Sequence, residues 1–104
     1  MKTLLACAVV SVVVLAGAGN ALASEAMAKK YGCFACHSMD KKSVGPAFKD
    51  VAAKYRGDAG AEAKLVARIK NGGGGVWGPN PMPSNSAVPD ADVRALVKWV
   101  LSLR

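Results

Sequence analysis

Cys33-Phe34-Ala35-Cys36-His37 is the stretch of sequence around which the rest of the chain is organised. In a helical turn Cys33 and Cys36 are related by i, i+3, and Cys33 and His37 by i, i+4, so the three side chains leave from one face. Cys-x-x-Cys-His is the attachment signature of a c-type haem, in which two thiols bond the porphyrin and the histidine takes one axial position on iron. The motif therefore predicts one covalently bound haem.

Other interpretations of a close cysteine pair are a disulfide or thioredoxin-like redox pair, half of a zinc site, or chance. A thioredoxin-like site would need a βαβ pattern around the cysteines, and a zinc site would need a second pair of ligands. The sequence shows neither pattern, and His37 is the only histidine in the chain. The context therefore favours haem attachment.

The N-terminal residues have the pattern of a targeting segment. Lys2 supplies a positive charge, residues 4–16 form a largely apolar run, and Ala21-Leu22-Ala23 has the small-x-small form of a cleavage site. We therefore predict a cleaved secretory signal peptide at residues 1–23 and one folded domain at residues 24–104. An uncleaved anchor is an alternative, although the apolar run is short for a membrane span.

A domain of this size needs more than its own apolar side chains to be stable. Small proteins usually recruit a disulfide, a metal or another staple, because their core alone is marginal. The chain has only two Phe and two Trp, so a haem would supply much of the core volume. Loss of the signal peptide would also remove Cys7 and leave Cys33 and Cys36 as the remaining cysteines. We expect the haem-free chain to be poorly folded.

The chain is basic, with 14 Lys and Arg against 7 Asp and Glu and a formal net charge of +7. Such a balance can steer association with an acidic partner, an anionic membrane surface or nucleic acid. The lysines are spread along the chain rather than gathered in one run, and nucleic acid does not suit an exported protein. A solvated surface without a specific role and a surface for docking both stay open.

Helix signals occur in the first half of the folded domain. Ser24 suits the N-cap of a first helix, which would run towards Gly32 and deliver the haem-binding turn. Pro46 suits the first turn of a second helix, because it lacks only an amide hydrogen that would be unpaired there. That second helix carries apolar residues at i, i+3, i+4 and i+7, namely Phe48, Val51, Ala52 and Tyr55.

Two further helices are expected in the second half, and no segment alternates in the manner of a strand. A third helix covers about residues 61–70, with Leu65, Val66 and Ile69 inward and Gly72 as its stop. Asp90 suits the cap of the last helix. Its apolar stripe is the clearest in the chain and consists of Val93, Leu96, Val97, Val100 and Leu101, with Trp99 beside it. The sequence therefore predicts an all-α fold.

Met82 is the candidate for a second iron ligand. It lies in the connection of residues 72–89, which is rich in glycine and proline and longer than most connections. Pro81 and Pro83 flank it and stiffen the backbone, so the loop could present the sulfur to iron with little loss of entropy. The alternative for Met82 is an ordinary packing methionine. Met39 is too close to His37 to reach the opposite side of the iron, and Met27 suits core packing.

The second ligand decides between two kinds of function. An open sixth position would permit gas binding or peroxide chemistry, whereas a second protein ligand closes the metal and favours electron transfer. Methionine opposite histidine also raises the reduction potential.

The mature chain resembles the small bacterial class I cytochromes c, specifically the cytochrome c-551 type, also called cytochrome c8. The first motif alone indicates only a c-type haem, whereas the set of matching segments in this order is specific. The segments are Cys33-Phe34-Ala35-Cys36-His37, Val44-Gly45-Pro46-Ala47-Phe48-Lys49-Asp50-Val51-Ala52, Arg68-Ile69-Lys70-Asn71-Gly72, Val76-Trp77-Gly78-Pro79, Pro81-Met82-Pro83 and Lys98-Trp99-Val100-Leu101.

The resemblance implies a class I cytochrome c fold, with four to five short helices wrapped around one haem c, and it implies roles for particular residues. The haem would be attached through Cys33 and Cys36, with His37 and Met82 as axial ligands. The Pro46 carbonyl would accept a hydrogen bond from the His37 ring, Arg68 and Trp77 would bind a haem propionate, and Asn85 would donate towards the Met82 sulfur. The segment Ser84-Asn85-Ser86-Ala87 is one residue longer here than in some members.

The leading hypothesis is a monomeric, periplasmic one-electron carrier with a low-spin His/Met haem, and not an enzyme. By resemblance, it would dock to redox partner proteins at an exposed haem edge. Because it is exported we expect no nucleic-acid partner, and we expect no stable membrane insertion after the signal peptide is cleaved. It would pass electrons from respiratory complexes to a terminal oxidase or a periplasmic reductase such as nitrite reductase. The alternatives are a haem enzyme or gas-binding sensor with an open sixth position, and a dithiol redox protein without haem.

Overall fold

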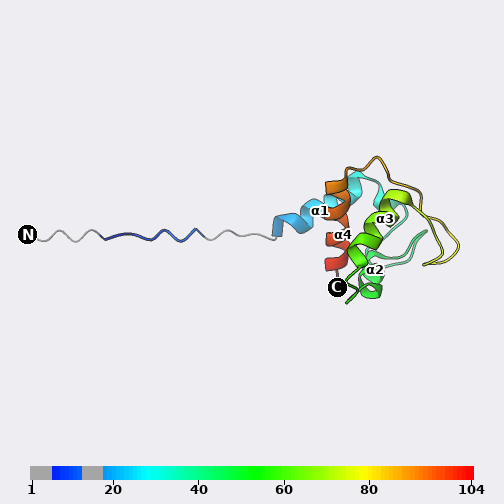
Figure 1. The fold of residues 1–104 in the computed structure, drawn as a ribbon, viewed down its shortest axis with the longest axis horizontal. Coiled ribbons are helices and arrows are strands. Elements are labelled where there is room, and N and C mark those ends of the chain that lie inside the picture. The colour runs from blue at the N-terminus through cyan, green and yellow to red at the C-terminus, as the bar shows by residue number, and fades with distance from the viewer. Residues whose placement is uncertain (1–5, 13–17) are drawn as a thin grey trace, which may run out of the picture.

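The computed structural model describes residues 6–12 and 18–104, and the regular elements in these residues are all helices (Figure 1). The only ladder pairing there is an isolated antiparallel bridge between Gly73 and Met82. The prediction of an all-α fold is confirmed. The elements are α1 (Ala18–Lys30), the short 3₁₀ helix η1 (Cys33–Ala35), α2 (Phe48–Lys54), α3 (Ala61–Asn71) and α4 (Asp90–Ser102).

The last helix, α4, is the element on which the other helices pack. It contacts α1, α2 and α3 (Figure 1). Val93 and Val97 are fully buried, and burying a side chain of this kind contributes about 1.5–3 kcal/mol. Leu96, Trp99 and Val100 are buried as well. The apolar stripe predicted for this helix therefore forms the centre of the fold.

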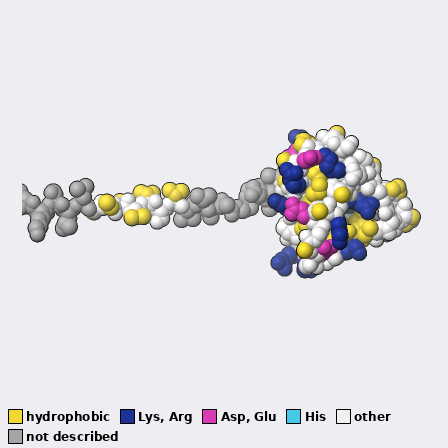
Figure 2. All heavy atoms as spheres, in the orientation of Figure 1, with side chains coloured by type: hydrophobic (Ala, Val, Ile, Leu, Met, Phe, Trp, Pro, Cys, Tyr) yellow, Lys and Arg dark blue, Asp and Glu magenta, His cyan; other side chains and the backbone are white. Residues whose placement is uncertain are grey.

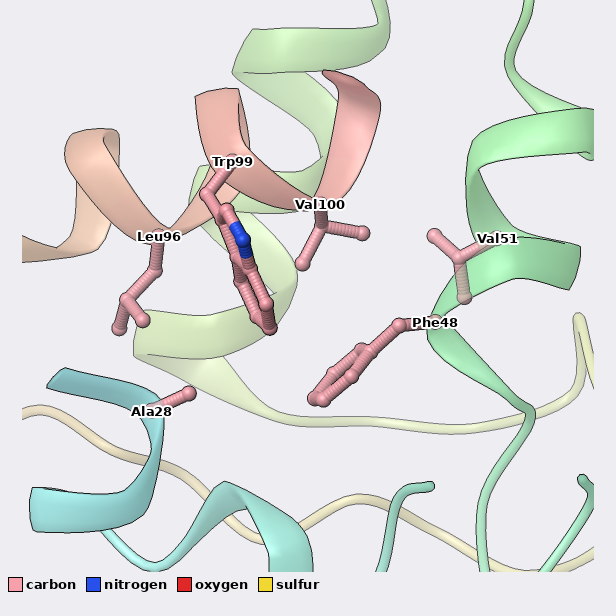
Figure 3. Close-up of a cluster of buried hydrophobic side chains, with 6 residues drawn as sticks. All are labelled: Ala28, Phe48, Val51, Leu96, Trp99 and Val100. Carbon is pink, nitrogen blue, oxygen red and sulfur yellow. The ribbon is translucent and has the colours of Figure 1, made fainter. Parts of the chain in front are cut away.

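Aromatic side chains join α4 to the helices that precede it. Figure 3 shows the Phe48 ring of α2 and the Trp99 ring of α4 turned towards one another, and their centroids are 5.5 Å apart. Phe34 also meets Phe48 edge to face, with ring centroids 5.5 Å apart. Such edge-on pairs add about 0.5–1.5 kcal/mol to the burial of their area. The haem-binding motif is thus packed directly onto the core.

The start of α1 differs from the prediction. The helix begins at Ala18 rather than at Ser24, which is buried inside it. Ala21-Leu22-Ala23 are strong helix formers, so in the full chain nothing breaks the helix before Ser24. Residues 6–12 have no secondary structure and are exposed, while residues 1–5 and 13–17 of the predicted signal peptide lie outside the described residues. No helix in the described part is both long and apolar enough to cross a bilayer.

Two other helix starts also differ by one or two residues from those expected. Ala47, with an extended backbone, precedes α2, so Pro46 lies outside the helix. Pro89 precedes α4, which makes Asp90 its first residue and not its cap. The Asp90 carboxylate forms an ion pair with Lys70 at the end of α3, and the ammonium group lowers the Asp90 pKa.

A hydrogen bond fixes α1 relative to α4. The Tyr31 hydroxyl, just after α1, donates to the Asp92 carboxylate at 2.5 Å. This bond raises the pKa of Tyr31, because the phenol can donate only while it is protonated. Its contribution to stability is therefore complete below the ordinary tyrosine pKa of about 10 and is lost as pH rises through the raised value.

Candidate functional site

A large, mostly apolar cavity lies between the helices and the connection that follows α3. Its empty volume is about 1260 Å³ when its mouth is included. Its lining is predominantly apolar, which suits a cofactor with a large apolar surface. Every helix contributes to its walls. The lining includes Ala28 and Tyr31 near α1, Phe48 and Val51 of α2, Leu65, Arg68 and Ile69 of α3, and Leu96, Val97, Trp99 and Val100 of α4.

Cys33, Cys36 and His37 form one turn at the wall of this cavity. The Cys33 carbonyl accepts from the Cys36 amide at 3.3 Å and from the His37 amide at 3.0 Å, which brings all three side chains to the cavity. Both thiols are half-buried and neither forms a disulfide. Burial raises the pKa of the Cys33 thiol.

The arrangement of ligating groups separates the interpretations of the cysteine pair. No group of three or more His, Cys, Asp or Glu side chains comes together in the described residues in a way that could hold a metal ion. A zinc site would need such a group. The apolar cavity beside Cys33 and Cys36 is an observation that favours the haem interpretation.

The His37 ring is held by its backbone and aromatic neighbours. Nδ1 lies 2.7 Å from the Pro46 carbonyl oxygen. Because a carbonyl oxygen can only accept, Nδ1 carries the hydrogen, and Nε2 keeps the lone pair that a metal requires. The Phe48 ring stacks on the imidazole, with centroids 5.0 Å apart and 21° between the planes. These contacts fix both the tautomer and the orientation of the ring.

Gly45 packs against the same ring so closely that a larger residue would not fit. A Cβ atom added there would lie 2.7 Å from Cε1 of His37 and 3.0 Å from Nδ1. The backbone cannot easily retreat, because the Gly45 amide donates to the Cys36 carbonyl at 2.8 Å and the Gly45 carbonyl accepts from Ser43 at 3.0 Å. Gly45 thus provides the space in which the imidazole lies.

Met82 lines the same cavity as His37. Its amide donates to the Gly73 carbonyl at 2.8 Å, and the Gly73 amide donates back at 3.0 Å, which fixes the backbone of the residue. Met27 and Met39 instead pack against the buried core. Of the methionines in the described residues, Met82 is the one at the cavity wall.

Arg68, Trp77 and Asn85 also line the cavity. The Arg68 guanidinium lies against Gly73, where a Cβ atom would overlap it. Trp77 is 39% exposed, and the Lys54 ammonium group lies 5.7 Å from its ring centroid. The Asn85 side chain donates to the Pro83 carbonyl at 3.1 Å. That bond uses one of the two amide hydrogens, so a contact of Asn85 with the Met82 sulfur stays a prediction.

These residues fit a covalently bound haem. The cavity places two half-buried thiols and an imidazole with a free Nε2 on a wall of apolar side chains, together with the guanidinium of Arg68. The helix α3 buries only Ala61, whereas its Leu65 and Ile69 remain half-buried at the cavity. A large flat apolar group in the cavity would therefore complete the burial of α3.

The sequence alone did not reveal several residues that shape the site. In the sequence, Gly45 stands out only as part of a segment that resembles the cytochromes, and Phe48 only as a core residue of a helix. Their contacts with His37 depend on tertiary structure, so no local pattern marks them. Gly72 was expected to end α3, which it does, with φ of 71°. Its proximity to the Met82 backbone is a second role that helix signals cannot show.

Comparisons with known proteins agree with this site. A family model described as cytochrome c matches residues 17–104. A cytochrome c-551 of Allochromatium vinosum is 57% identical over 86 residues, which cover 83% of this chain and 92% of that protein. A cytochrome c-551 of Pseudomonas aeruginosa is 63% identical over 78 residues, covering 75% of this chain and 74% of that protein.

Solved structures agree as well. The crystal structure of wild-type Nitrosomonas europaea cytochrome c552 superposes with a TM-score of 0.74 and 50% identity. The match covers 77% of this chain and 99% of that chain. The class I cytochrome c fold expected from the sequence is therefore confirmed.

The substitution Gly45→Ala tests how tightly His37 is held. Gly45 does not have a positive φ, so alanine can adopt its backbone conformation, and the whole effect should come from the contact with the ring. We expect a loss of about 1–3 kcal/mol in the unfolding free energy of the haem-loaded protein, as in other overpacked sites. Chemical denaturation followed by the haem absorbance measures this loss.

Gly60→Ala is the matched control. A Cβ atom there would lie 3.4 Å from the nearest atom, an ordinary contact, and the residue precedes α3 on the surface. Its cost should be limited to the weaker N-cap preference of alanine, below about 1 kcal/mol. Equal stability losses in the two variants would show that the space beside His37 is not constrained.

Proposed function

This chain belongs to the cytochrome c family, and on that basis we propose that it is a periplasmic one-electron carrier whose iron is held by His37 and Met82. Its cofactor is one haem c, covalently attached, and the spacing of Cys33 and Cys36 fits this attachment. The chain is a small electron-carrying cytochrome and not an enzyme. Ligation of the iron by His37 and Met82, the redox partners and the periplasmic location are what we propose.

The placement of His37 and Met82 supports the ligand pair. Both residues line one cavity, and the hydrogen bond from Nδ1 to Pro46 leaves Nε2 of His37 for the metal. When bound, the haem iron would supply one-electron chemistry between its two oxidation states, and a methionine ligand together with His37 would favour the reduced state. A His/Met pair would also leave no open position for a substrate or a gas. The placement of His37 and Met82 at one cavity is therefore the observation that favours an electron carrier over a gas-binding sensor.

The walls of the cavity support the same role. Most of the side chains packed around it are aliphatic or aromatic, so they would keep water from the metal and lower the local dielectric, which is one way in which proteins set a reduction potential. Arg68 lies beside Gly73 at the cavity and Trp77 near its mouth. We propose that these two residues bind a haem propionate.

The mouth of the cavity supports docking of redox partners at an exposed haem edge. The large apolar side chains most exposed in the folded domain are there: Val44 is 55%, Val76 47% and Trp77 39% exposed. Figure 2 shows Lys and Arg side chains spread over one face of the molecule with a few acidic ones among them. We propose that the protein is a monomer that docks its electron donor and its electron acceptor at this mouth. It would receive electrons from respiratory complexes and pass them to a terminal oxidase or a reductase such as nitrite reductase.

The periplasmic location rests on the predicted signal peptide of residues 1–23. The exposed segment of residues 6–12, where Val9 is 86% exposed, adds nothing to the core, which suits a segment that is removed. Intact mass of the exported protein should correspond to a chain that begins at Ser24 and carries one haem. A mass that retains residues 1–23 would contradict cleavage.

Met82→Ala tests the proposed ligand pair. The oxidised wild-type protein should show a long-wavelength sulfur-to-iron charge-transfer band, and the variant should lose it. The reduced variant should also bind carbon monoxide at neutral pH, which the wild type should resist because its sixth position is filled. Absorption spectra of both proteins in both oxidation states measure these changes.

Met39→Ala is the control, because Met39 is half-buried against the core and does not line the cavity. It should keep the band and resist carbon monoxide. A wild-type protein that binds carbon monoxide readily, or a Met82→Ala variant with an unchanged spectrum, would support the open-site alternative instead.

Ionic strength tests the docking role of the basic surface. Attraction between this chain and an acidic redox partner should weaken as salt screens the charges over about 10 Å at 0.1 M. We expect the rate of electron transfer to such a partner to fall as salt is added, while the rate with an uncharged small reagent stays constant. Equal and flat salt profiles for the two reactions would remove electrostatic docking.

A further inference from the structure

The C-terminal end of α3 is capped by the segment that carries Met82. The last four carbonyls of a helix have no partner within it. The Arg68 carbonyl accepts from the Gly72 amide at 2.8 Å. The next two carbonyls are satisfied from much further along the chain: Ile69 accepts from the Asn85 amide at 2.9 Å, and Lys70 accepts from the Ser84 hydroxyl at 2.8 Å.

The backbone at the end of α3 also lies close to the backbone of the Met82 segment. A Cβ atom at Gly72 would lie 2.5 Å from the Met82 carbonyl oxygen and 2.8 Å from the Ser84 nitrogen. The paired hydrogen bonds between Gly73 and Met82 continue this contact by one residue. The returning chain is therefore held against the helix end on both sides of Pro83, which has no amide hydrogen with which to contribute.

Ser84 provides the one side-chain hydrogen bond between this segment and α3 among the described residues. The side chain of Asn85 instead bonds within its own segment, to the Pro83 carbonyl. Lys70, whose carbonyl Ser84 contacts, is also held through its ammonium group by Asp90 at the start of α4. The hydroxyl thus connects the Met82 segment to the junction of two helices.

We propose that Ser84 is a positioning residue for Met82, acting through its hydrogen bond to the Lys70 carbonyl. The bond caps α3 and at the same time holds the Met82 backbone at the cavity, so the helix end and the sixth iron ligand loosen together. This inference rests on the proposed ligation by Met82. It assigns the strength of that ligation partly to a residue that touches neither the iron nor the haem.

Ser84→Ala tests the proposal in the oxidised, haem-loaded protein, with imidazole as the probe. Imidazole binds iron only when Met82 leaves, so its apparent affinity reports how firmly the methionine is held. A neutral hydrogen bond of this kind changes an equilibrium by about two- to tenfold, and we expect imidazole to bind more tightly by that factor. The charge-transfer band should weaken in parallel.

Two further variants separate positioning from a general effect on the loop. Ser86 is exposed in the same segment, and its side chain makes no hydrogen bond to the residues that the structure describes, so Ser86→Ala should leave imidazole affinity unchanged. Ser84→Thr keeps the hydroxyl and should restore an affinity close to that of the wild type. A merely structural role would lower the unfolding free energy without this pattern of affinities.

The outcomes distinguish the role of Ser84 from the ligation by Met82 on which that role rests. A wild-type protein without the charge-transfer band would overturn the proposed ligation, and the role of Ser84 with it. A wild-type protein with the band, together with a Ser84→Ala variant that binds imidazole no more tightly, would overturn the role of Ser84 alone. Equal increases in Ser84→Ala and Ser86→Ala would also overturn it.

Discussion

The fold depends on contact between its apolar side chains and a group that the chain does not itself supply. Each helix turns side chains towards one cavity, and α3, which packs on α4, buries only Ala61 while Leu65 and Ile69 stay half-buried at the cavity. Apolar burial is the dominant favourable term in folding, and a haem adds apolar area where the chain lacks it. Attachment at Cys33 and Cys36 keeps that area in place, so the cofactor is a structural element as well as the redox centre.

The two proposed iron ligands are held by different kinds of structure. His37 is fixed locally, by Pro46 and Phe48 close by in the chain and by the space that Gly45 leaves. Met82 belongs to a long connection and is held through the end of α3. Local contacts persist when distant parts of a protein loosen, whereas a loop held by a few hydrogen bonds opens at lower cost. The methionine side is therefore the side at which we expect ligand exchange to begin.

Much of the fold could be predicted from local patterns. The spacing of apolar residues predicted the buried face of α4, and Gly72 predicted the C-terminal end of α3. Both features are found in the structure. The predicted starts of α1, α2 and α4 differ from those observed. The helix α1 extends back through Ala21-Leu22-Ala23, Pro46 lies before α2 with its carbonyl on His37, and Asp90 pairs with Lys70 instead of capping α4. The cysteine motif indicated the cofactor. The residues that support the ligands, such as Gly45 and Ser84, depend on distant neighbours and have no local signature.

The measurement that tests this dependence most directly is the thermal unfolding of the full chain without its haem, followed by far-ultraviolet circular dichroism. A Cys33→Ser, Cys36→Ser variant purified free of haem provides the sample, and the haem-loaded wild type provides the reference. We predict weak helical ellipticity and a broad, uncooperative transition, because α3 and the cavity walls would face water. A cooperative transition with the helix content of the haem-loaded protein would contradict the claim that the cofactor completes the core.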